Sequence, residues 1–330
     1  MLELALPLAV DWEAILSIEF LIQIMAIAGV YAVLSLGLQV NVGYTGISNF
    51  GQAGFAALGA YVMAVLVTGG PDGDGLLSFW IAMPIAIIVT MLFGLLVGSV
   101  SLRLRADYFA IATIAAAEAV RIFAQNADSI TGGNQPLFGY DSSFEAITEG
   151  IEDFLESAFG WDTPLYTGFV IVIWTTLFLS AFVLTRMQRT PWGRVLRAVR
   201  EDEDAARALG KNSFSYKLQS LLVSSFFGAL GGGFLAMYFG VINPNNFEPA
   251  ITFLAYGVLI LGGLASYWGV LVGAMVLWFL IESTRYLDIG LSGQQEASLR
   301  FMVVGLVLIL LMAFRPQGLF GKKEEMVLGE

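Results

Sequence analysis

Long runs without a charged residue dominate the hydrophobic pattern of the chain. The longest run covers residues 20–71, and others cover 75–102, 163–185, 218–247 and 249–281. A helix needs about 20 apolar residues to cross a bilayer. We therefore expect the 20–71 and 249–281 runs to hold two passes each. The pattern predicts an all-α, polytopic helical membrane protein.

About nine transmembrane passes fit these runs, within a range of about eight to ten because glycine and polar residues blur the last three boundaries. They are expected at residues 20–40, 51–69, 79–101, 107–125, 164–185, 214–240, 248–265, 267–287 and 297–314. Some of these segments are expected to be broken by glycine or to re-enter the membrane.

The charged residues between the passes are segregated by sign. Of the 16 lysines and arginines, eight lie between residues 186 and 217, whereas residues 125–163 hold none and carry eight acidic residues. Because basic residues concentrate in cytoplasmic loops, the basic segment is predicted inside and the acidic segment outside. The predicted regions are a single transmembrane domain over 1–330 with its N-terminus outside, an external acidic loop at 126–163, a cytoplasmic loop at 186–213 and a cytoplasmic tail at 315–330.

Composition narrows the chemistry that such a chain can perform. It is 57% hydrophobic with 37 glycines, has a net charge of −11, and contains neither cysteine nor histidine. Disulfides, thiol nucleophiles and the commonest metal ligands are therefore excluded, which argues against an integral-membrane enzyme. The acidic start, with Glu3, Asp11 and Glu13, lacks the basic region of a secretory signal peptide, so no such peptide is expected.

A polar, glycine-rich stretch interrupts the longest apolar run. It reads NVGYTGISNFGQAGFAALGAY over residues 41–61, and its polar side chains include Asn41, Tyr44, Thr45, Ser48, Asn49 and Gln52. One interpretation is a loop at the cytoplasmic interface, with close helix packing through small residues. The other is a broken helix lining a translocation path, since non-helical backbone at membrane depth is buried in protein or faces a wet cavity. A second interruption at 261–274 supports the broken helix, because paired breaks point to transport sites.

Two pairs of opposite charge fall inside predicted passes, Glu118 with Arg121 and Glu282 with Arg285. The members of each pair are three residues apart, which places both side chains on one face of a helix. A charge at the bilayer centre is costly, so the pairs are expected near the interface or facing the bundle interior. Two roles remain open, a structural ion pair and a gate or lining of a pathway.

Two short helices are predicted in the basic segment. The first begins at Pro191, after Thr190 as its N-cap. Between its apolar positions lie Arg194, Arg197 and Arg200. Four acidic residues at 201–204 lead into the second helix, which Gly210 closes as a left-handed C-cap. One interpretation is a helix lying on an anionic membrane surface. The acidic block would repel the same lipids, so a groove on a protein partner is favoured.

The stretch DAARALG in the second helix resembles the EAA-x-x-x-G coupling segment of ABC-transporter permeases. The matching positions are Asp204, where Glu is usual, Ala205, Ala206 and Gly210. Further stretches between residues 37 and 274 are similar, in the same order, to the LivM-type permeases of branched-chain amino acid importers. They are GLQVNVGYTGISNFGQAGFAALGAY, LRLRADYFAIATIAAAEAVRI, TGGNQPL, TPWGRVLRAVREDEDAARALG and LILGGLASYWGVLVGA. Urea and short-amide permeases share this pattern.

The resemblance implies a multi-pass subunit of the cell membrane that translocates branched-chain amino acids, or urea or short amides, by alternating access. Its implied partners are a second, LivH-type permease, two ATPase subunits, an external substrate-binding protein and the lipid bilayer, with no nucleic acid. No cofactor is expected on this chain, and ATP and Mg are expected on the ATPase subunits, because the sequence has no G-x-x-x-x-G-K-[ST] phosphate loop. A secondary transporter or channel is the alternative class, but its coupling acids would lie in mid-membrane, and here the acids lie almost wholly in loops.

Two sets of functional residues are expected on this basis. The residues expected to couple the chain to an ATPase are Arg194, Arg197, Arg200, Glu201, Asp204, Ala205, Ala206 and Gly210. The residues expected to line the translocation path are Asn41, Tyr44, Thr45, Ser48, Asn49, Gln52, Glu118 and Arg121. The polar groups between 41 and 52 would meet the ammonium and carboxylate of the substrate, in an otherwise apolar path. No catalytic or metal-ligating residue is expected.

Overall fold

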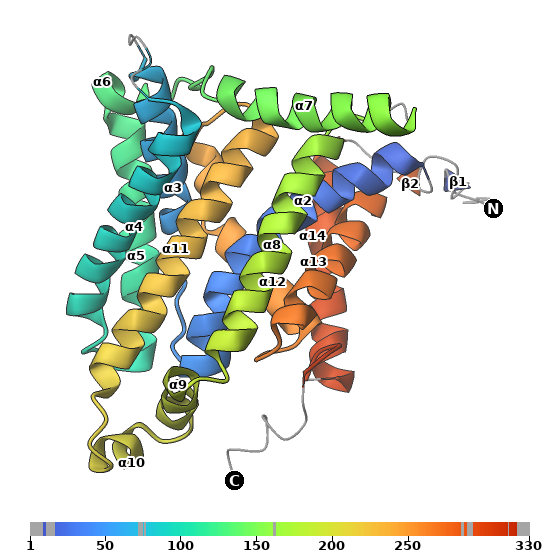
Figure 1. The fold of residues 1–330 in the computed structure, drawn as a ribbon. Helices are drawn as coiled ribbons and strands as arrows, with labels where there is room; N and C mark the ends of the chain where they lie inside the picture. Colours follow the sequence, from blue (N-terminus) through green and yellow to red (C-terminus); the bar gives the residue numbers. More distant parts are fainter. Residues whose placement is uncertain are drawn as a thin grey trace, which may run out of the picture.

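The computed structural model describes residues 9–10, 17–71, 75, 77–160, 163–284, 287–288, 293–315 and 317–321, which form a bundle of helices (Figure 1). The helices are α2 (Ile18–Leu38), the π-helix η1 (Gln39–Thr45), α3 (Gln52–Thr68), α4 (Phe79–Ser101), α5 (Ala106–Asn126), α6 (Asp128–Thr131), α7 (Ser142–Phe159), α8 (Thr167–Met187), α9 (Pro191–Glu201), α10 (Glu203–Ala208), α11 (Ser213–Phe239), the 3-10 helix η2 (Pro244–Phe247), α12 (Ala250–Gly262), α13 (Tyr267–Ser283) and α14 (Gly293–Phe314). A single antiparallel pair of two-residue strands, β1 (Ala9–Val10) and β2 (Leu287–Asp288), is the described exception to the all-α prediction.

The prediction of a polytopic helical membrane protein is confirmed. Among the described residues, four segments are long and apolar enough to cross a bilayer, namely Ile18–Thr45 (α2 with η1), α4, α8 and α11. Residues Pro244–Gly262 and α13 form a pair bent by 114°, which would add a fifth segment as one broken span. Each predicted pass coincides with a helix, but α3 has only 17 residues, so the count of nine stays a prediction.

The two charged segments lie at opposite ends of the bundle, as their charges predict (Figure 1). The acidic segment was expected to be a loop, yet it contains α6 and the 18-residue helix α7, which runs across one end. Helices α9 and α10 lie at the other end. The assignment of these two ends to the outside and the cytoplasm stays a prediction from charge, and we refer to them as the α7 end and the α9 end.

Small residues bring α3 and α11 close together in the core. A Cβ added to Gly59 would lie 2.4 Å from Cα of Ala229, and one added to Gly232 would lie 2.0 Å from the carbonyl oxygen of Ala56. Larger side chains at these positions would push the two helices apart, as in membrane bundles that pack through small residues. Helix α2 packs beside them and is buried continuously from Ala26 to Leu38. The polar stretch therefore begins just after the buried end of α2.

Candidate functional site

The polar stretch in the first apolar run forms a break between α2 and α3. After α2 the chain continues as the π-helix η1, whose turns are wider than those of an α-helix. Its C-cap is Gly46, which has a φ of 74°, a conformation that glycine adopts without strain. Residues 46–51 have no regular structure, and α3 begins at Gln52. We call residues 39–51 the first break.

Five of the six polar residues predicted here are buried: Asn41, Tyr44, Thr45, Asn49 and Gln52. Two serines of α11 bind four of these side chains. Ser220 donates to the side-chain oxygen of Asn41 and accepts from the hydroxyl of Thr45, both at 2.8 Å. Ser224 donates to Gln52 Oε1 at 2.9 Å and accepts from Asn49 Nδ2 at 3.3 Å. These four side chains therefore form two hydrogen-bonded clusters, one at Ser220 and one at Ser224, that join the first break and the start of α3 to α11.

The backbone of the first break is satisfied by side chains of neighbouring helices. The N–H of Phe50 donates to Thr113 of α5 at 3.1 Å. The carbonyl of Asn49 accepts from the hydroxyl of Tyr256 on α12 at 2.9 Å. Non-helical backbone persists at membrane depth when protein surrounds it in this way. Ser48, the sixth polar residue, lines a cavity of about 170 Å³ beside α5 and α10.

The second glycine-rich interruption separates α12 from α13, and we call its residues 263–266 the second break. Gly263 has a φ of 106° and Ala265 a φ of 61°. A non-glycine residue at positive φ is strained, and such strain clusters at functional sites. Gly262 permits a sharp return of the chain, because a Cβ there would lie 2.1 Å from the carbonyl oxygen of Gly269.

The two breaks contact each other at Tyr44. Its hydroxyl donates to the carbonyl of Ala265 at 2.6 Å and also bonds the side-chain oxygen of Gln188, just after α8. Its ring stacks on Tyr267, the first residue of α13, with centroids 5.1 Å apart. The two interruptions seen in the sequence thus form one structural unit, which we call the break junction.

Helix α9 is attached to the break junction by arginines. These side chains donate to backbone carbonyl oxygens near the ends of α8 and η1: Arg194 to Arg189, Arg197 to Gln188 and Arg200 to Gly43. Carbonyl groups at the C-terminal end of a helix carry partial negative charge, so cations are stabilised there. Arg197 also lies over the ring of Tyr44, 5.8 Å from its centroid. Arg197 and Arg200 therefore connect α9 to the bundle, whereas Arg194 bonds to the turn just before its own helix.

Helix α10 leaves most of its predicted coupling residues exposed. Asp202 caps it, because its carboxylate accepts from the N–H groups of Asp204 and Ala205, both at 2.9 Å. The side chain of Asp204 is 94% exposed, while Ala206 is buried against the bundle. Gly210 has a φ of 78°, which confirms the predicted left-handed cap, and nothing lies within 4 Å of the position that a Cβ would take.

Glu203 connects α10 to α11. Its carboxylate pairs with Arg207 and with Lys217 of α11. Burial opposes ionisation of Glu203, but hydrogen bonds from Lys217 and Ser213 outweigh it and hold the pKa of this carboxyl below its ordinary value. The neighbouring Glu201 is exposed at the end of α9. The acidic block is thus divided between one attached and several exposed carboxylates.

The predicted ion pair in α5 lies outside the break junction. Nε of Arg121 donates to Glu118 at 2.9 Å, and Nη1 of Arg121 donates to Asn245 of η2 at 3.4 Å. The pair therefore lies between α5 and η2, apart from the other predicted path residues. Of the second pair, Glu282 is buried, and Arg285 lies outside the described residues.

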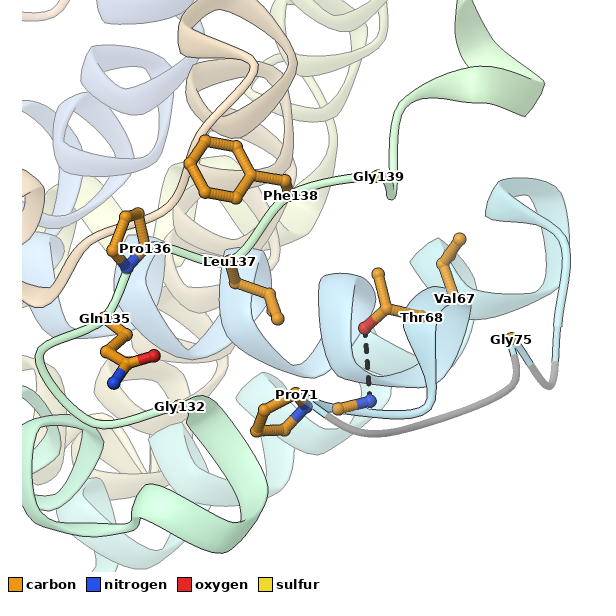
Figure 2. Close-up of a pocket in the computed structure, with 11 residues that line it drawn as sticks. Val67, Thr68, Pro71, Gly75, Gly132, Gln135, Pro136, Leu137, Phe138 and Gly139 are labelled. Carbon is orange, nitrogen blue, oxygen red and sulfur yellow. Dashed lines mark hydrogen bonds between the residues drawn. The ribbon is translucent and has the colours of Figure 1, made fainter.

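A cavity lies at each end of the bundle. At the α7 end, a cavity of about 470 Å³ separates the end of α3 from the loop 132–139, and none of its described lining residues is charged (Figure 2). Thr68, at the end of α3, accepts from the N–H of Gly70 at 3.1 Å along its rim. At the α9 end, a cavity of about 320 Å³ lies beside the break junction and is lined by Tyr44, Arg189 and Arg197 among others.

Sequence reasoning missed several partners that hold the break junction together. Ser220 and Ser224 are four residues apart on one face of α11, which was an available signal. Gln39, whose side-chain amide donates to the carbonyl of Gly263 at 3.3 Å, lay just before the stretch that was singled out. Gln188 gave no signal, because it is 144 residues away from Tyr44 in the chain. Ala265 lies within the second interruption, but its bond to Tyr44, 221 residues away, did not follow from the sequence.

A polytopic helical bundle, with two broken segments in contact and a charged helix pair at one end, has the architecture of a membrane transport subunit. Residues 20–312 match the family described as the permease component of branched-chain amino acid transport systems, and the chain belongs to this family.

Curated relatives support the same assignment. The chain is 34% identical to the high-affinity branched-chain amino acid transport permease LivM of Escherichia coli K12, over 95% of this chain and 73% of the relative. It is 27% identical to the permease BraD of Pseudomonas aeruginosa, over 93% of this chain and 96% of the relative. It is 27% identical to the permease LivH of Salmonella typhimurium, over 91% and 94%. The predicted LivM-type resemblance is confirmed, and no solved structure matches the chain.

Proposed function

We propose that this chain is the membrane-spanning subunit of an ABC importer and that it translocates branched-chain amino acids by alternating access. Family membership and the names of the relatives support the substrate class. The observation that carries the mechanism is the attachment of α9 to the break junction through Arg197 and Arg200. This attachment connects an exposed charged surface to the two places where membrane helices are interrupted.

In this proposal the chain transmits motion within the complex and does not act as an enzyme. Closure of partner ATPases moves α10 and α9 together. Arg200 passes the displacement to Gly43 of η1, and Tyr44 passes it to Ala265 in the second break. A packed bundle switches between discrete arrangements, so a shift at the α9 end closes one opening as the other forms.

The proposed importer needs partner chains. They are a second, LivH-type permease, two ATPase subunits that bind ATP and Mg, and an external substrate-binding protein. Similarity to both LivM and LivH relatives supports a pair of homologous permeases. The cavity at the α7 end has no charged described lining residue, which suits the entry of an amino acid with no net charge. No cofactor is proposed for this chain.

The location proposed is the cell membrane, with the α9 end cytoplasmic and the N-terminus outside. The chain has no cysteine, so single cysteines can be introduced at Ser142, near the start of α7, and at Lys211, after α10; both residues are exposed. An impermeant thiol reagent applied to intact cells should label Ser142→Cys and spare Lys211→Cys. The opposite labelling pattern would reverse the orientation.

The substrate is tested with the complex of this chain and the partner chains proposed above, reconstituted in vesicles. We expect ATP-dependent uptake of labelled leucine, isoleucine and valine. Uptake of urea or acetamide in their place would favour the alternative substrates of the same family. Uptake driven by an ion gradient without ATP would place the chain among secondary transporters and overturn the proposal.

A further inference from the structure

The cavity at the α9 end is lined by two arginines and by no described acidic residue. Arg189 comes from the turn after α8, and Arg197 comes from α9. Within the part of the chain that the structure describes, neither guanidinium has a carboxylate within ion-pair distance. Thr185, Ser266 and Trp268 belong to the neutral remainder of the lining. Among the described residues, no acidic side chain therefore compensates the positive charge of the cavity.

Arg197 also has a donor without an acceptor. Its Nη2 donates to the carbonyl of Gln188 at 3.2 Å, but its Nε is buried and unpaired among the described residues. A guanidinium N–H that is shielded from water is costly until an acceptor reaches it. The planar fork of donors on an arginine matches the geometry of phosphate oxygens. The positive charge of the cavity and the guanidinium geometry of its two arginines fit an anion of this kind.

The flank of the cavity carries exposed aromatic side chains. Trp268, which lines the cavity, is 46% exposed, and its ring lies 6.1 Å from that of Phe178 on α8, which is 47% exposed. Farther along α8, Arg186 lies over the exposed ring of Phe182, at 5.1 Å from its centroid. Tryptophan is enriched at the level of the lipid headgroups, and basic side chains near the membrane surface attract anionic headgroups. This setting matches a lipid molecule better than a soluble anion.

We propose that this cavity binds the phosphate of an anionic phospholipid, with Arg189 and Arg197 as its ligands and with the acyl chains lying along Phe178 and Trp268. Basic pockets between membrane helices on the cytoplasmic side recognise anionic headgroups. Arg197 also attaches α9 to the end of α8, so the bound lipid stabilises the attachment of α9 to the break junction. The proposal goes beyond the transport function and holds whichever substrate crosses.

The test uses the purified complex in nanodiscs of phosphatidylcholine, with and without added phosphatidylglycerol. Melting temperature and the lipid retained in native mass spectrometry are measured. Phosphatidylglycerol raises the melting temperature of the unmodified complex and is retained, whereas R189Q/R197Q binds it about tenfold more weakly or worse. The matched control K211Q keeps the full response, since Lys211 is an exposed basic residue at the same end of the bundle that does not line the cavity. An unchanged response in R189Q/R197Q would overturn the site.

A second variant keeps the test decisive where the double substitution harms folding. Thr185→Glu places a carboxylate in the cavity, where it pairs with the arginines in place of the lipid. We expect this variant to be stable in phosphatidylcholine alone and insensitive to phosphatidylglycerol, and a response equal to that of the unmodified complex would count against the proposal. Inorganic phosphate is added separately. If it reproduced the effect of phosphatidylglycerol, the lipid would not be the ligand.

Discussion

Helices α9 and α10 are consecutive and lie at the same end of the bundle, yet they use their charges in opposite ways. In α9, Arg197 and Arg200 point to the bundle and donate to backbone carbonyl oxygens at the ends of α8 and η1. In α10, the side chain of Asp204 is 94% exposed. Just after α10, nothing lies within 4 Å of the position that a Cβ on Gly210 would take. The charged strip is therefore divided into an internal attachment and a surface available to a partner. Charged residues that are close together in the sequence thus differ in role according to the atoms that they contact.

We expect the largest effect from removal of the Tyr44 ring, which disrupts the contacts that attach α9 to the bundle. Tyr44 is almost fully buried, stacks on Tyr267 and lies under Arg197. Truncation of a buried aromatic ring costs about 3–5 kcal/mol. Tyr44→Ala should therefore lower the melting temperature of the purified complex strongly.

The matched control for this substitution is Tyr44→Phe. It keeps the ring and removes the hydroxyl that donates to Ala265, which is worth about 1 kcal/mol. We expect a small loss of stability in this variant. If Tyr44→Ala melted as Tyr44→Phe does, the stacking at the break junction would carry little stability.

A substitution at Gly210 tests the role of the exposed helix α10. Valine at a φ of 78° costs about 1–2 kcal/mol locally, because a left-handed conformation brings its Cβ too close to the backbone. Gly210→Val should distort the end of α10 and abolish the stimulation of ATP hydrolysis by the loaded binding protein. Gly210→Asn should retain it, since asparagine tolerates this conformation. Equal stimulation in the two variants would show that the cap has no role in coupling.

The smallest expected effect concerns the link between α10 and α11. Lys217 and Ser213 hold the pKa of Glu203 below the ordinary value of 4.5, so the folded protein binds this proton less readily than the unfolded chain. The stabilisation is present above that pH and is lost as the pH falls through the lowered pKa. It amounts to about 1 kcal/mol or less, as for other partly exposed ion pairs. Thermal melting should depend on acidic pH more in the unmodified protein than in Glu203→Gln, and identical profiles would contradict this.

Local boundaries followed well from the sequence where a residue restricts its own backbone. Helix α9 begins at Pro191 after Thr190, as predicted, because proline fixes φ at a helix start. The helix in the acidic segment did not follow from the sequence, because the acidic residues concealed the spacing of its apolar positions. Phe144 of α7 is buried, and Ile151 and Leu155 are half-buried at helical spacing from it, a period that the five acidic residues of this helix concealed.

The candidate site was only partly predictable, because its environment comes from distant segments. The polar residues of the first break could be named, but Thr45 and Asn49 each bond a serine 175 residues later in the chain. The structure shows the close packing through small residues that one interpretation expects, and it shows the break buried in protein. That these residues line a translocation path stays a prediction. Similarly, the direction of Arg200 depends on Gly43, 157 residues away.

The most direct test of the central claim, that α9 passes the motion of α10 to the break junction, is the number of substrate molecules taken up per ATP hydrolysed by the reconstituted complex. Arg200→Ala is compared with Arg194→Ala, which removes the same side chain; among the described residues Arg194 bonds to Arg189, five residues before it, and not to the first break. We predict that Arg200→Ala retains stimulated ATP hydrolysis but loses most uptake per ATP, whereas Arg194→Ala keeps its uptake per ATP. An unchanged uptake per ATP in Arg200→Ala would contradict the claim.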